Sequence, residues 1–489
     1  MRRLSLALLT AFCLLPVLPA GAAPPEVPST DEIYDTTAEV AAFGARMTGT
    51  PEGKAAADYV ERTLESYGLD AWQEHATSYL WRPHRWGLEV GGQTIDAFPS
   101  WHSFTESATD TGPFATDPGG TQAEVVDVGD GLGDQFRRTD VRGKIVLFNL
   151  RFYTPLLALG LGAEFLYDPR LTLLKDSAAL KQANPYITSY TDVLKQVKAR
   201  GAVGFIGVLS DYYDSNKYLN EYYRRLNVSV PGVWVTKTDG AQVRSLVRAG
   251  RGKAPGRLTL EGSRDEVQAN TVVGVLPGQS KETIQVQSHH DSMSEGAVED
   301  ATGTAEVLAL AKAFASVPQA ERKRTLMFTT FDTHFTGYQA HQAFLDKYVT
   351  NPDSPYEFVA NMTIEHIGLA GVVRNGKLVM SSLPEPRGVF RTGSSVIRNA
   401  IQRAIVTQNL TRTAVIPANG LKGIPTDASF LVPTKVPVIS LVSGPIYLYD
   451  EGDVMAKVAR NELRPVAKAF AQMIDRLDDV PASAMRHGG

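Results

Sequence analysis

The chain has 489 residues, of which 43% are hydrophobic and 21% are charged, and its formal net charge is −4. This length allows two or three domains with a large core, and the composition is ordinary for a globular protein. Because there is no basic excess to neutralise phosphates, the sequence argues against nucleic acid as a partner.

The first 23 residues have the pattern of a secretory signal peptide. Arg2 and Arg3 precede an apolar run from Leu4 to Leu18, and small residues follow at 20–23. The run is shorter than the roughly 20 residues that a membrane-spanning helix needs. We therefore expect cleavage, a secreted or periplasmic protein, and no membrane span. The single cysteine, Cys13, lies in this segment, so the mature protein has no disulfide or thiol chemistry.

The first part of the mature chain is predicted to be helical. Residues 31–67 have an apolar stripe of helical spacing, interrupted by the turn-rich segment Arg46 to Gly53. From about 120 to 262 the pattern changes to β-branched strands near 140–148, 199–208 and 230–235, followed by an amphipathic helix at 239–249.

The last part, from 270 to about 477, alternates strands and helices. Strands are predicted at 271–276, 284–288, 325–331, 359–364 and 438–441, and helices near 304–314, 337–345, 393–405 and 461–474. This alternation predicts an α/β fold with a mostly parallel sheet flanked by helices. Sites in such sheets lie outside the carboxyl ends of the strands. His289, His334 and Glu365 each closely follow a predicted strand, which predicts a site at that edge.

The most informative motif is residues 288–303, SHHDSMSEGAVEDATG, between a predicted strand and a predicted helix. His289 and Asp291 end the strand, and Glu299 with Asp300 precedes the helix. An imidazole and two later carboxylates at a rigid strand end are the groups that a zinc site needs.

This motif resembles the co-catalytic di-zinc aminopeptidase and glutamate carboxypeptidase family, in which H-x-D is followed by G-A-x-D-N-A-S-G. The turn at 46–53 is similar to the R-x-x-G-T-P-G turn of that family. The strand order within 100–262 resembles an inserted protease-associated domain. The resemblance implies a discontinuous zinc-peptidase-like domain at 31–95 and 266–480, interrupted by the smaller, β-rich insertion at 100–262.

The resemblance also implies a set of site residues. His289 corresponds to the first histidine ligand, Glu299 to the bridging aspartate, and Glu365 to the later aspartate ligand. Asp291 corresponds to the carboxylate that orients the site. Each glutamate is one methylene longer than the family's aspartate and remains a competent zinc ligand.

The second zinc position of the family is not retained in this sequence. The consecutive glutamates that serve as base and ligand correspond to His334 and Phe335, and the last histidine ligand corresponds to Tyr449. Phenylalanine cannot bind zinc and tyrosine rarely does. We therefore expect one zinc ion, with His334 as either the general base or a fourth ligand.

The resemblance implies a secreted metallopeptidase-like hydrolase, most simply a zinc-dependent aminopeptidase acting on peptides or amino-acyl compounds. The alternative is an inactive binding protein, as the transferrin receptor is within this family. A serine hydrolase is set aside, because Gly393-Ser394-Ser395 lacks the second glycine and the preceding strand of a nucleophile elbow.

Overall fold

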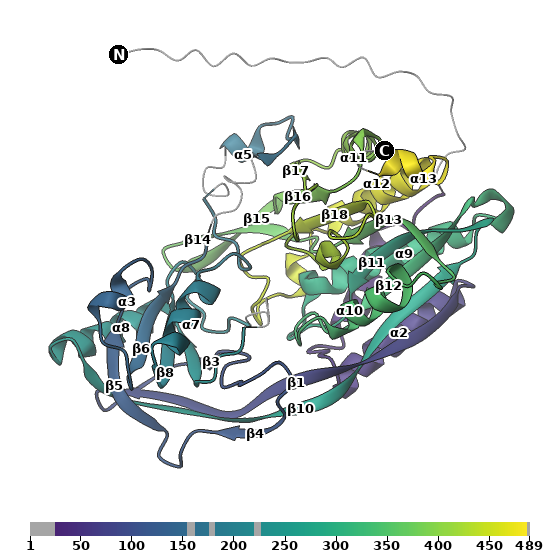
Figure 1. The fold of residues 1–489 in the computed structure, drawn as a ribbon. Helices are drawn as coiled ribbons and strands as arrows, with labels where there is room; N and C mark the ends of the chain where they lie inside the picture. Colours follow the sequence, from purple (N-terminus) through teal and green to yellow (C-terminus); the bar gives the residue numbers. More distant parts are fainter. Residues whose placement is uncertain (1–24, 154–161, 176–180, 220–225, 487–489) are drawn as a thin grey trace, which may run out of the picture.

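The computed structural model describes residues 25–153, 162–175, 181–219 and 226–486 (Figure 1). The predicted signal peptide, residues 1–23 with Cys13, lies outside them. The helices of four residues or more are α1 Thr30–Ala41, α2 Pro51–Ser66, α3 Gln135–Arg138, α5 Thr172–Lys175, α7 Tyr190–Ala199, α8 Lys237–Ala249, α9 Thr302–Ala315, α10 Gln339–Phe344, α11 Ser395–Thr407, α12 Arg460–Asp478 and α13 Ala482–Met485. Shorter or irregular helical turns are η2 Ala297–Ala301, η3 Gln319–Glu321, η4 Leu345–Val349, η5 Asp427–Phe430 and η6 Met455–Lys457.

One large mixed sheet runs through both lobes of the molecule. Its strands are β1 Asp70–Val90, β2 Gln93–Ile95, β3 Phe98–Pro99, β4 Gly112–Ala115, β5 Thr121–Asp127, β6 Ile145–Leu150, β7 Phe165–Tyr167, β8 Gly204–Leu209, β9 Gly232–Val235, β10 Ala254–Leu276, β11 Ser280–His289, β12 Arg324–Phe331, β13 Glu357–Ile364, β16 Arg387–Arg391, β17 Thr413–Pro417 and β18 Val438–Ser443. A separate hairpin pairs β14 Leu369–Arg374 with β15 Lys377–Pro384.

The sheet that positions the site is parallel at its centre. The order is β10-β12-β11-β13-β18-β16, and β11, β12, β13 and β18 all run in the same direction. The chain leaves β11 for β12 on one side and then crosses back to β13 on the other. The carboxyl ends of β11, β12 and β13 therefore meet at a switch in strand order, where open α/β sheets bind their ligands. This confirms the predicted α/β class with a mixed, mostly parallel sheet.

Both faces of this sheet are covered by helices. Gly274 in β10 lies against Leu64 of α2, whereas the neighbouring Val273 and Val275 pack with Phe344 of α10. Since alternate residues of a strand point to opposite faces, α2 and α10 cover opposite sides. Helices α1, α9 and α12 pack together, and the buried residues Val307, Leu310 and Phe314 place α9 in the core.

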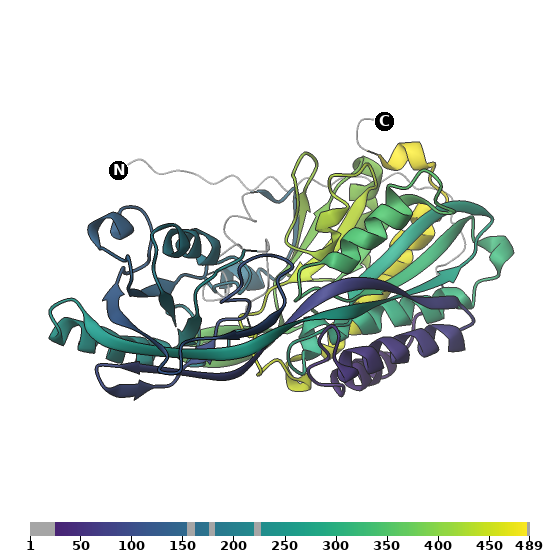
Figure 2. The ribbon, with the colours of Figure 1, turned by 60° about the horizontal axis from the view of Figure 1, so that its bottom comes forward.

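A two-stranded antiparallel ribbon joins the two lobes (Figures 1 and 2). β1 pairs with β10 along nearly its whole length, from Asp70 opposite Val275 to Val90 opposite Gly256. β10 continues into the second lobe, where it pairs with β5, and β6, β8 and β9 follow in parallel. The predicted boundary between 262 and 266 thus falls inside β10, and the sequence did not predict β1 as a strand.

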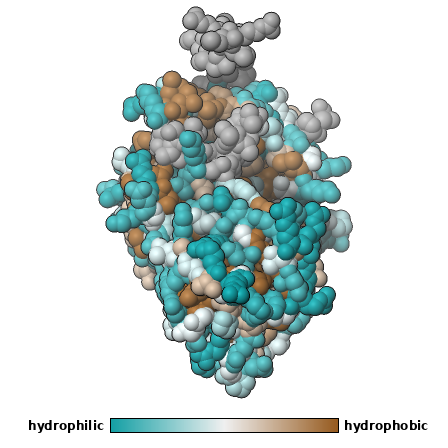
Figure 3. All heavy atoms as spheres, turned by 90° about the vertical axis from the view of Figure 1, so that its left-hand side faces the viewer, coloured by the Kyte–Doolittle hydropathy of each residue, from teal (hydrophilic) through white to brown (hydrophobic). Residues whose placement is uncertain are grey.

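The surface at the free end of the second lobe is mainly hydrophilic, with hydrophobic side chains scattered among polar ones (Figure 3). Among the described residues, no helix combines the length and the apolar character needed to cross a bilayer.

Candidate metal centre

Three strand ends and one distant turn bring the ionisable side chains of the site together. His289 is the last residue of β11, His334 follows β12, and His366 follows β13. Asp427 begins η5, which contacts the end of β13. These four side chains are at most 4% exposed.

Glu299 enters the site from η2, an irregular turn between β11 and α9. Gly296 opens this turn with φ 51°, a left-handed conformation that glycine adopts without strain. The Asp453 carboxylate accepts hydrogen bonds from the backbone N–H groups of Val298 and Glu299 at 3.1 and 2.8 Å. Burial raises the pKa of Asp453 to about 8, although these two hydrogen bonds favour the charged form. Asp453 therefore fixes the backbone from which the Glu299 side chain projects.

Arg46 holds the preceding part of the same loop. Its fully buried guanidinium donates to the backbone oxygens of His290 at 2.6 Å, Glu295 at 2.6 Å and Gly296 at 2.9 Å. Burial lowers the pKa of Arg46 to about 10, which still leaves it charged at neutral pH. The turn at 46–53, which the sequence analysis singled out, thus shapes the loop that carries Glu299.

The Glu299 carboxylate lies at the centre of three imidazole rings. Its oxygens are 3.4 Å from His289 Nε2, 3.6 Å from His334 Nε2 and 2.6 Å from His366 Nε2. His366 Nε2 lies at ion-pair distance from Glu299, yet neither it nor either Glu299 oxygen has a partner in hydrogen-bond geometry. His289 Nε2 has none either. Buried polar atoms without partners are rare in folded proteins and point to a bound group.

The other nitrogen of each ring faces an acceptor. His289 Nδ1 is 3.1 Å from the backbone oxygen of Asp291 and 3.3 Å from its carboxylate. His334 Nδ1 is 2.8 Å from Asp427 Oδ1, and His366 Nδ1 is 2.9 Å from the backbone oxygen of Ser443. These acceptors hold a hydrogen on Nδ1, so each ring presents a lone pair at Nε2 once the Nε2 proton is lost, which is the arrangement of metal-binding histidines. Burial opposes the charged form of His366, but Glu299 raises its pKa to about 10.

The site concentrates carboxyl groups in the protein interior. Six carboxyl groups around it are at most 2% exposed: Asp291, Glu299, Asp300, Glu365, Asp427 and Asp453. Burial and the proximity of Asp427 raise the pKa of Glu365 to about 8. Burial also favours the neutral form of Glu299, but His366 and His289 outweigh it and lower its pKa. A cation at the centre would offset this charge.

The chemistry of these donors fits a zinc ion. Two sets of side chains offer donor atoms within 4.8 Å of one another: His289 with Asp300 and His366, and His289 with His334 and Asp427. Imidazole nitrogens and carboxylate oxygens are typical zinc ligands. Asp300 is also engaged elsewhere, because it accepts from Ser288 Oγ at 2.6 Å and from the backbone N–H groups of Gly303 and His366 at 3.0 Å.

The residues predicted from the sequence occupy different layers of the site. His289, Glu299 and His334 meet at its centre, and Asp291 lies behind the His289 ring. Glu365 lies further back: its carboxylate accepts from the Asp427 backbone N–H at 2.9 Å, and it belongs to neither donor set.

The sequence analysis did not include His366, Asp427 or His341 in the site. His341 Nε2 lies 2.9 Å from Asp427 Oδ2, so Asp427 is flanked by His334 and His341. The only signal in the sequence was the clustering of histidines between 289 and 366. Asp427, in a loop some 60 residues further on, gave none.

Aromatic side chains lie along one side of the site. The Phe335 ring lies 6.0 Å from that of Tyr449, and Tyr186 lies 5.9 Å from Tyr449 on its other side. Both Phe335 and Tyr449 are 3% exposed. They form an apolar wall beside His289 and His366.

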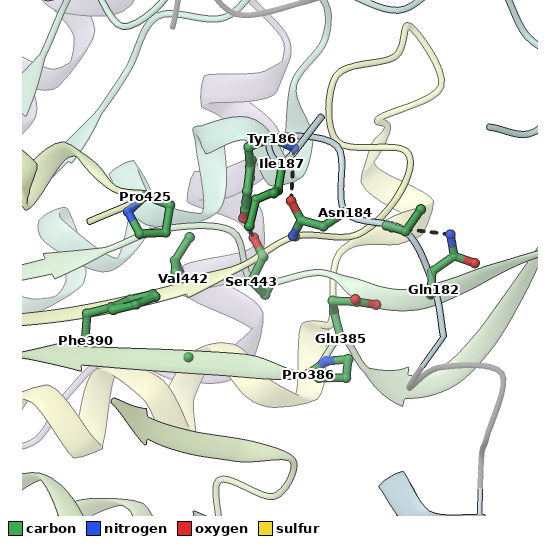
Figure 4. A pocket seen from close by; sticks show the side chains of 13 residues that line it. Gln182, Asn184, Tyr186, Ile187, Glu385, Pro386, Phe390, Pro425, Val442 and Ser443 are labelled. Carbon is green, nitrogen blue, oxygen red and sulfur yellow. Dashed lines mark hydrogen bonds between the residues drawn. The ribbon is translucent and has the colours of Figure 1, made fainter. Parts of the chain in front are cut away.

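A pocket adjoins this wall at Tyr186, which is one of its lining residues (Figure 4). It encloses about 540 Å3 of empty space, part of it open to solvent. Its apolar lining includes Ile187, Phe390 and Val442, while Tyr186 and Ser443 connect it to the metal centre. The Tyr186 hydroxyl donates to the Ser443 backbone oxygen, which also faces His366 Nδ1.

Part of the chain matches a known family of proteins. Residues 271–474 match the model of Peptidase family M28. The matched segment contains the four side chains that meet at the centre, namely His289, Glu299, His334 and His366, and it also contains Asp427. Arg46 and Tyr186 both precede it, so two parts of the chain on its N-terminal side also contribute to the site.

A curated relative extends the comparison beyond the M28 segment. The chain is 25% identical over 256 residues to a "Probable lipoprotein aminopeptidase LpqL" of Mycobacterium tuberculosis. This alignment covers 52% of the chain and 41% of the relative, so the chain spans less than half of that protein's length.

Solved structures show the fold over nearly the whole chain. A Peptidase M28 precursor from Shewanella amazonensis has a TM-score of 0.64 at 18% identity, covering 92% of this chain and 93% of that one. The zinc aminopeptidase BSAP from Bacillus subtilis has a TM-score of 0.62 at 16% identity, covering 94% and 98%. The aminopeptidase from Aneurinibacillus sp. strain AM-1 has a TM-score of 0.58 at 16% identity, covering 91% and 93%.

Proposed function

We propose that the protein is a zinc-dependent aminopeptidase-type hydrolase that acts on peptides or amino-acyl compounds outside the cytoplasm. One observation carries the proposal: unpartnered imidazole and carboxylate atoms converge at the carboxyl ends of parallel strands within the M28 segment. When bound, a zinc ion supplies Lewis acidity toward a carbonyl group or a water molecule.

The side chains around the centre have separate roles in this proposal. Asp291 orients His289, and Asp453 and Arg46 hold the loop that carries Glu299. The low exposure of these groups excludes bulk water, which strengthens every electrostatic interaction at the centre. The apolar pocket behind Tyr186 would receive an uncharged side chain of the substrate.

Three further features belong to the proposal. Residues 100–262 would form the inserted protease-associated-type domain, which the parallel strands β5, β6, β8 and β9 with helix α8 support. Export is supported by the pattern of residues 1–23 and by the lipoprotein name of the mycobacterial relative. A single metal ion is supported by the positions of Phe335 and Tyr449.

The proposal is tested with amino-acyl p-nitroanilides and dipeptides as substrates. The protein should release free amino acids, lose activity after chelation and regain it with zinc. Glu299→Gln should abolish turnover, whereas the exposed Glu266→Gln on β10 should not change it. A zinc-loaded protein that hydrolyses none of these substrates would refute the proposal.

A second candidate function is binding without catalysis. The aromatic wall of Phe335, Tyr449 and Tyr186 favours a binding function, because two of its residues occupy positions at which the resemblance requires metal ligands. A zinc-loaded protein that is inactive on all substrates but binds peptides with a measurable Kd would establish it.

A further inference from the structure

The M28-type resemblance assigns the later zinc ligand to Glu365, but the Glu365 carboxylate belongs to neither set of converging donor atoms. It accepts the Asp427 backbone N–H at 2.9 Å. The next residue, His366, takes a left-handed backbone conformation with φ 62°, and its Nε2 lies 2.6 Å from Glu299. A side chain one residue further along the chain has thus taken the place beside the bridging carboxylate.

The separations of Glu299 from two of the three imidazoles match one tetrahedral ion, whereas its 2.6 Å contact with His366 is shorter than such an ion leaves. With metal–ligand bonds of about 2.0–2.1 Å, the ligand atoms of a tetrahedral zinc lie roughly 3.3–3.5 Å apart. The Glu299 Oε1 oxygen is 3.4 Å from His289 Nε2 and 3.6 Å from His334 Nε2. Donor atoms of His289 and His366 also lie within 4.8 Å of each other.

The hydrogen bonds of the imidazole rings also favour a single shared ion. All three rings turn Nδ1 toward an oxygen acceptor, namely Asp291, Asp427 and the Ser443 backbone. Their Nε2 lone pairs therefore face the Glu299 carboxylate, which is itself electron-rich. Buried lone pairs facing a carboxylate need a cation between them, and a metal ion at this position takes the place that a proton on Nε2 otherwise fills.

We propose that this chain has relocated its metal site: one divalent ion of the zinc class is bound by Nε2 of His289, His334 and His366 together with Glu299. Glu365 lies outside the ligand set and anchors the turn that carries Asp427. Asp427 is a positioning residue that fixes the His334 tautomer and is itself flanked by His341. This inference deepens the proposed function, on which its catalytic meaning rests, but the metal site can be tested without any substrate.

The test measures metal binding by the full mature chain. Purified protein is stripped, reloaded with zinc or cobalt, and analysed by elemental analysis, by the visible spectrum of cobalt and by X-ray absorption. We expect one ion per chain, a tetrahedral cobalt spectrum and scattering from three imidazoles. His366→Ala and His334→Ala should lose the ion, while Glu365→Gln should retain it. Asp427→Asn should weaken affinity by about 10–100-fold, as for other outer partners of metal-bound histidine.

Several results would contradict the proposed ligand set. Loss of the ion in Glu365→Gln with retention in His366→Ala, or a wild-type spectrum with one imidazole, would overturn the relocated site. Absence of any bound metal would overturn it as well. The wild-type imidazole count decides the question even if a histidine variant fails to fold, which circular dichroism would reveal. Metal bound by three imidazoles without hydrolysis would refute only the proposed function.

Discussion

Replacing Arg46 by alanine should destabilise the fold and weaken metal binding at the same time. The guanidinium is fully buried, and its hydrogen bonds to the backbone oxygens of His290 and Gly296 are buried as well. Hydrogen bonds to charged groups contribute about 1.5–3 kcal/mol each, and leaving buried carbonyls unsatisfied incurs a similar cost. These two bonds alone therefore predict a loss of about 3–6 kcal/mol in the free energy of unfolding.

Arg322 offers a matched control for this experiment. It is 8% exposed and also donates to backbone oxygens, those of Pro277 at 3.0 Å, Val317 and Phe314, but in a part of the fold remote from η2. Arg322→Ala should reduce stability by a comparable amount and leave metal affinity unchanged. Arg46→Ala should in addition lower metal affinity by about 10–100-fold, because the loop that carries Glu299 loses its support.

The assay combines urea unfolding, followed by circular dichroism, with zinc titration against a competing chelator. Arg46→Lys keeps the charge but cannot bond several carbonyls at once, so it should recover only part of the loss. A stability change of less than about 1 kcal/mol for Arg46→Ala would contradict the hydrogen-bond argument. Equal losses of metal affinity in both alanine variants would show that Arg46 does not act through the η2 loop.

Three further predictions follow from buried groups and from the pocket. Glu306 in α9 has no hydrogen-bond partner, and burial together with Asp300 raises its pKa, so it keeps its proton in the fold while the unfolded chain loses it. Glu306→Gln should therefore be more stable than the wild type above pH 4.3, and in urea unfolding its advantage should grow by up to about 1.4 kcal/mol per pH unit. A difference in unfolding free energy between the two proteins that stays constant from pH 4 to 8 would contradict this. Burial and the nearby Arg264 lower the pKa of His102 to about 3, so stability should fall by up to about 1.4 kcal/mol per unit as pH drops below 6.5. The same titrations on His102→Gln should give a shallower slope, and an unchanged slope would exclude His102 as its source. Val442→Phe should narrow the pocket and lower kcat/KM for leucyl substrates more than for alanyl substrates. Equal losses for both substrates would show that the pocket does not bind the substrate side chain.

Much of the α/β core could be predicted because its signals are local. The apolar runs of β11, β12 and β13, and the helical periodicity of α9 and α12, predicted these elements within a few residues. The motif from 288 to 303 predicted His289 and Glu299 at the site, since both follow directly from a strand end and a turn. These predictions needed no knowledge of distant contacts.

The remaining parts depend on contacts that a single sequence does not display. β1 has polar residues on both faces and becomes a strand because β10 pairs with it along its length. His366 turns toward Glu299 only because its backbone adopts φ 62°, which breaks the alternation expected after β13. Asp427 reaches His334 from a loop 93 residues away in sequence.

The β1–β10 ribbon also limits how the molecule can be divided. A domain joined by flexible linkers can be excised or can swing as a rigid body, but here two paired strands of 21 and 23 residues run through both lobes, with one register shift between Pro83 and Arg85. Deleting residues 100–262 would remove the part of β10 that pairs with β5 and would leave the far end of β1 as an unpaired edge. Unpaired edge strands promote aggregation. Because β10 also pairs with β12, the ribbon connects the second lobe directly to the sheet whose strand ends carry the histidines.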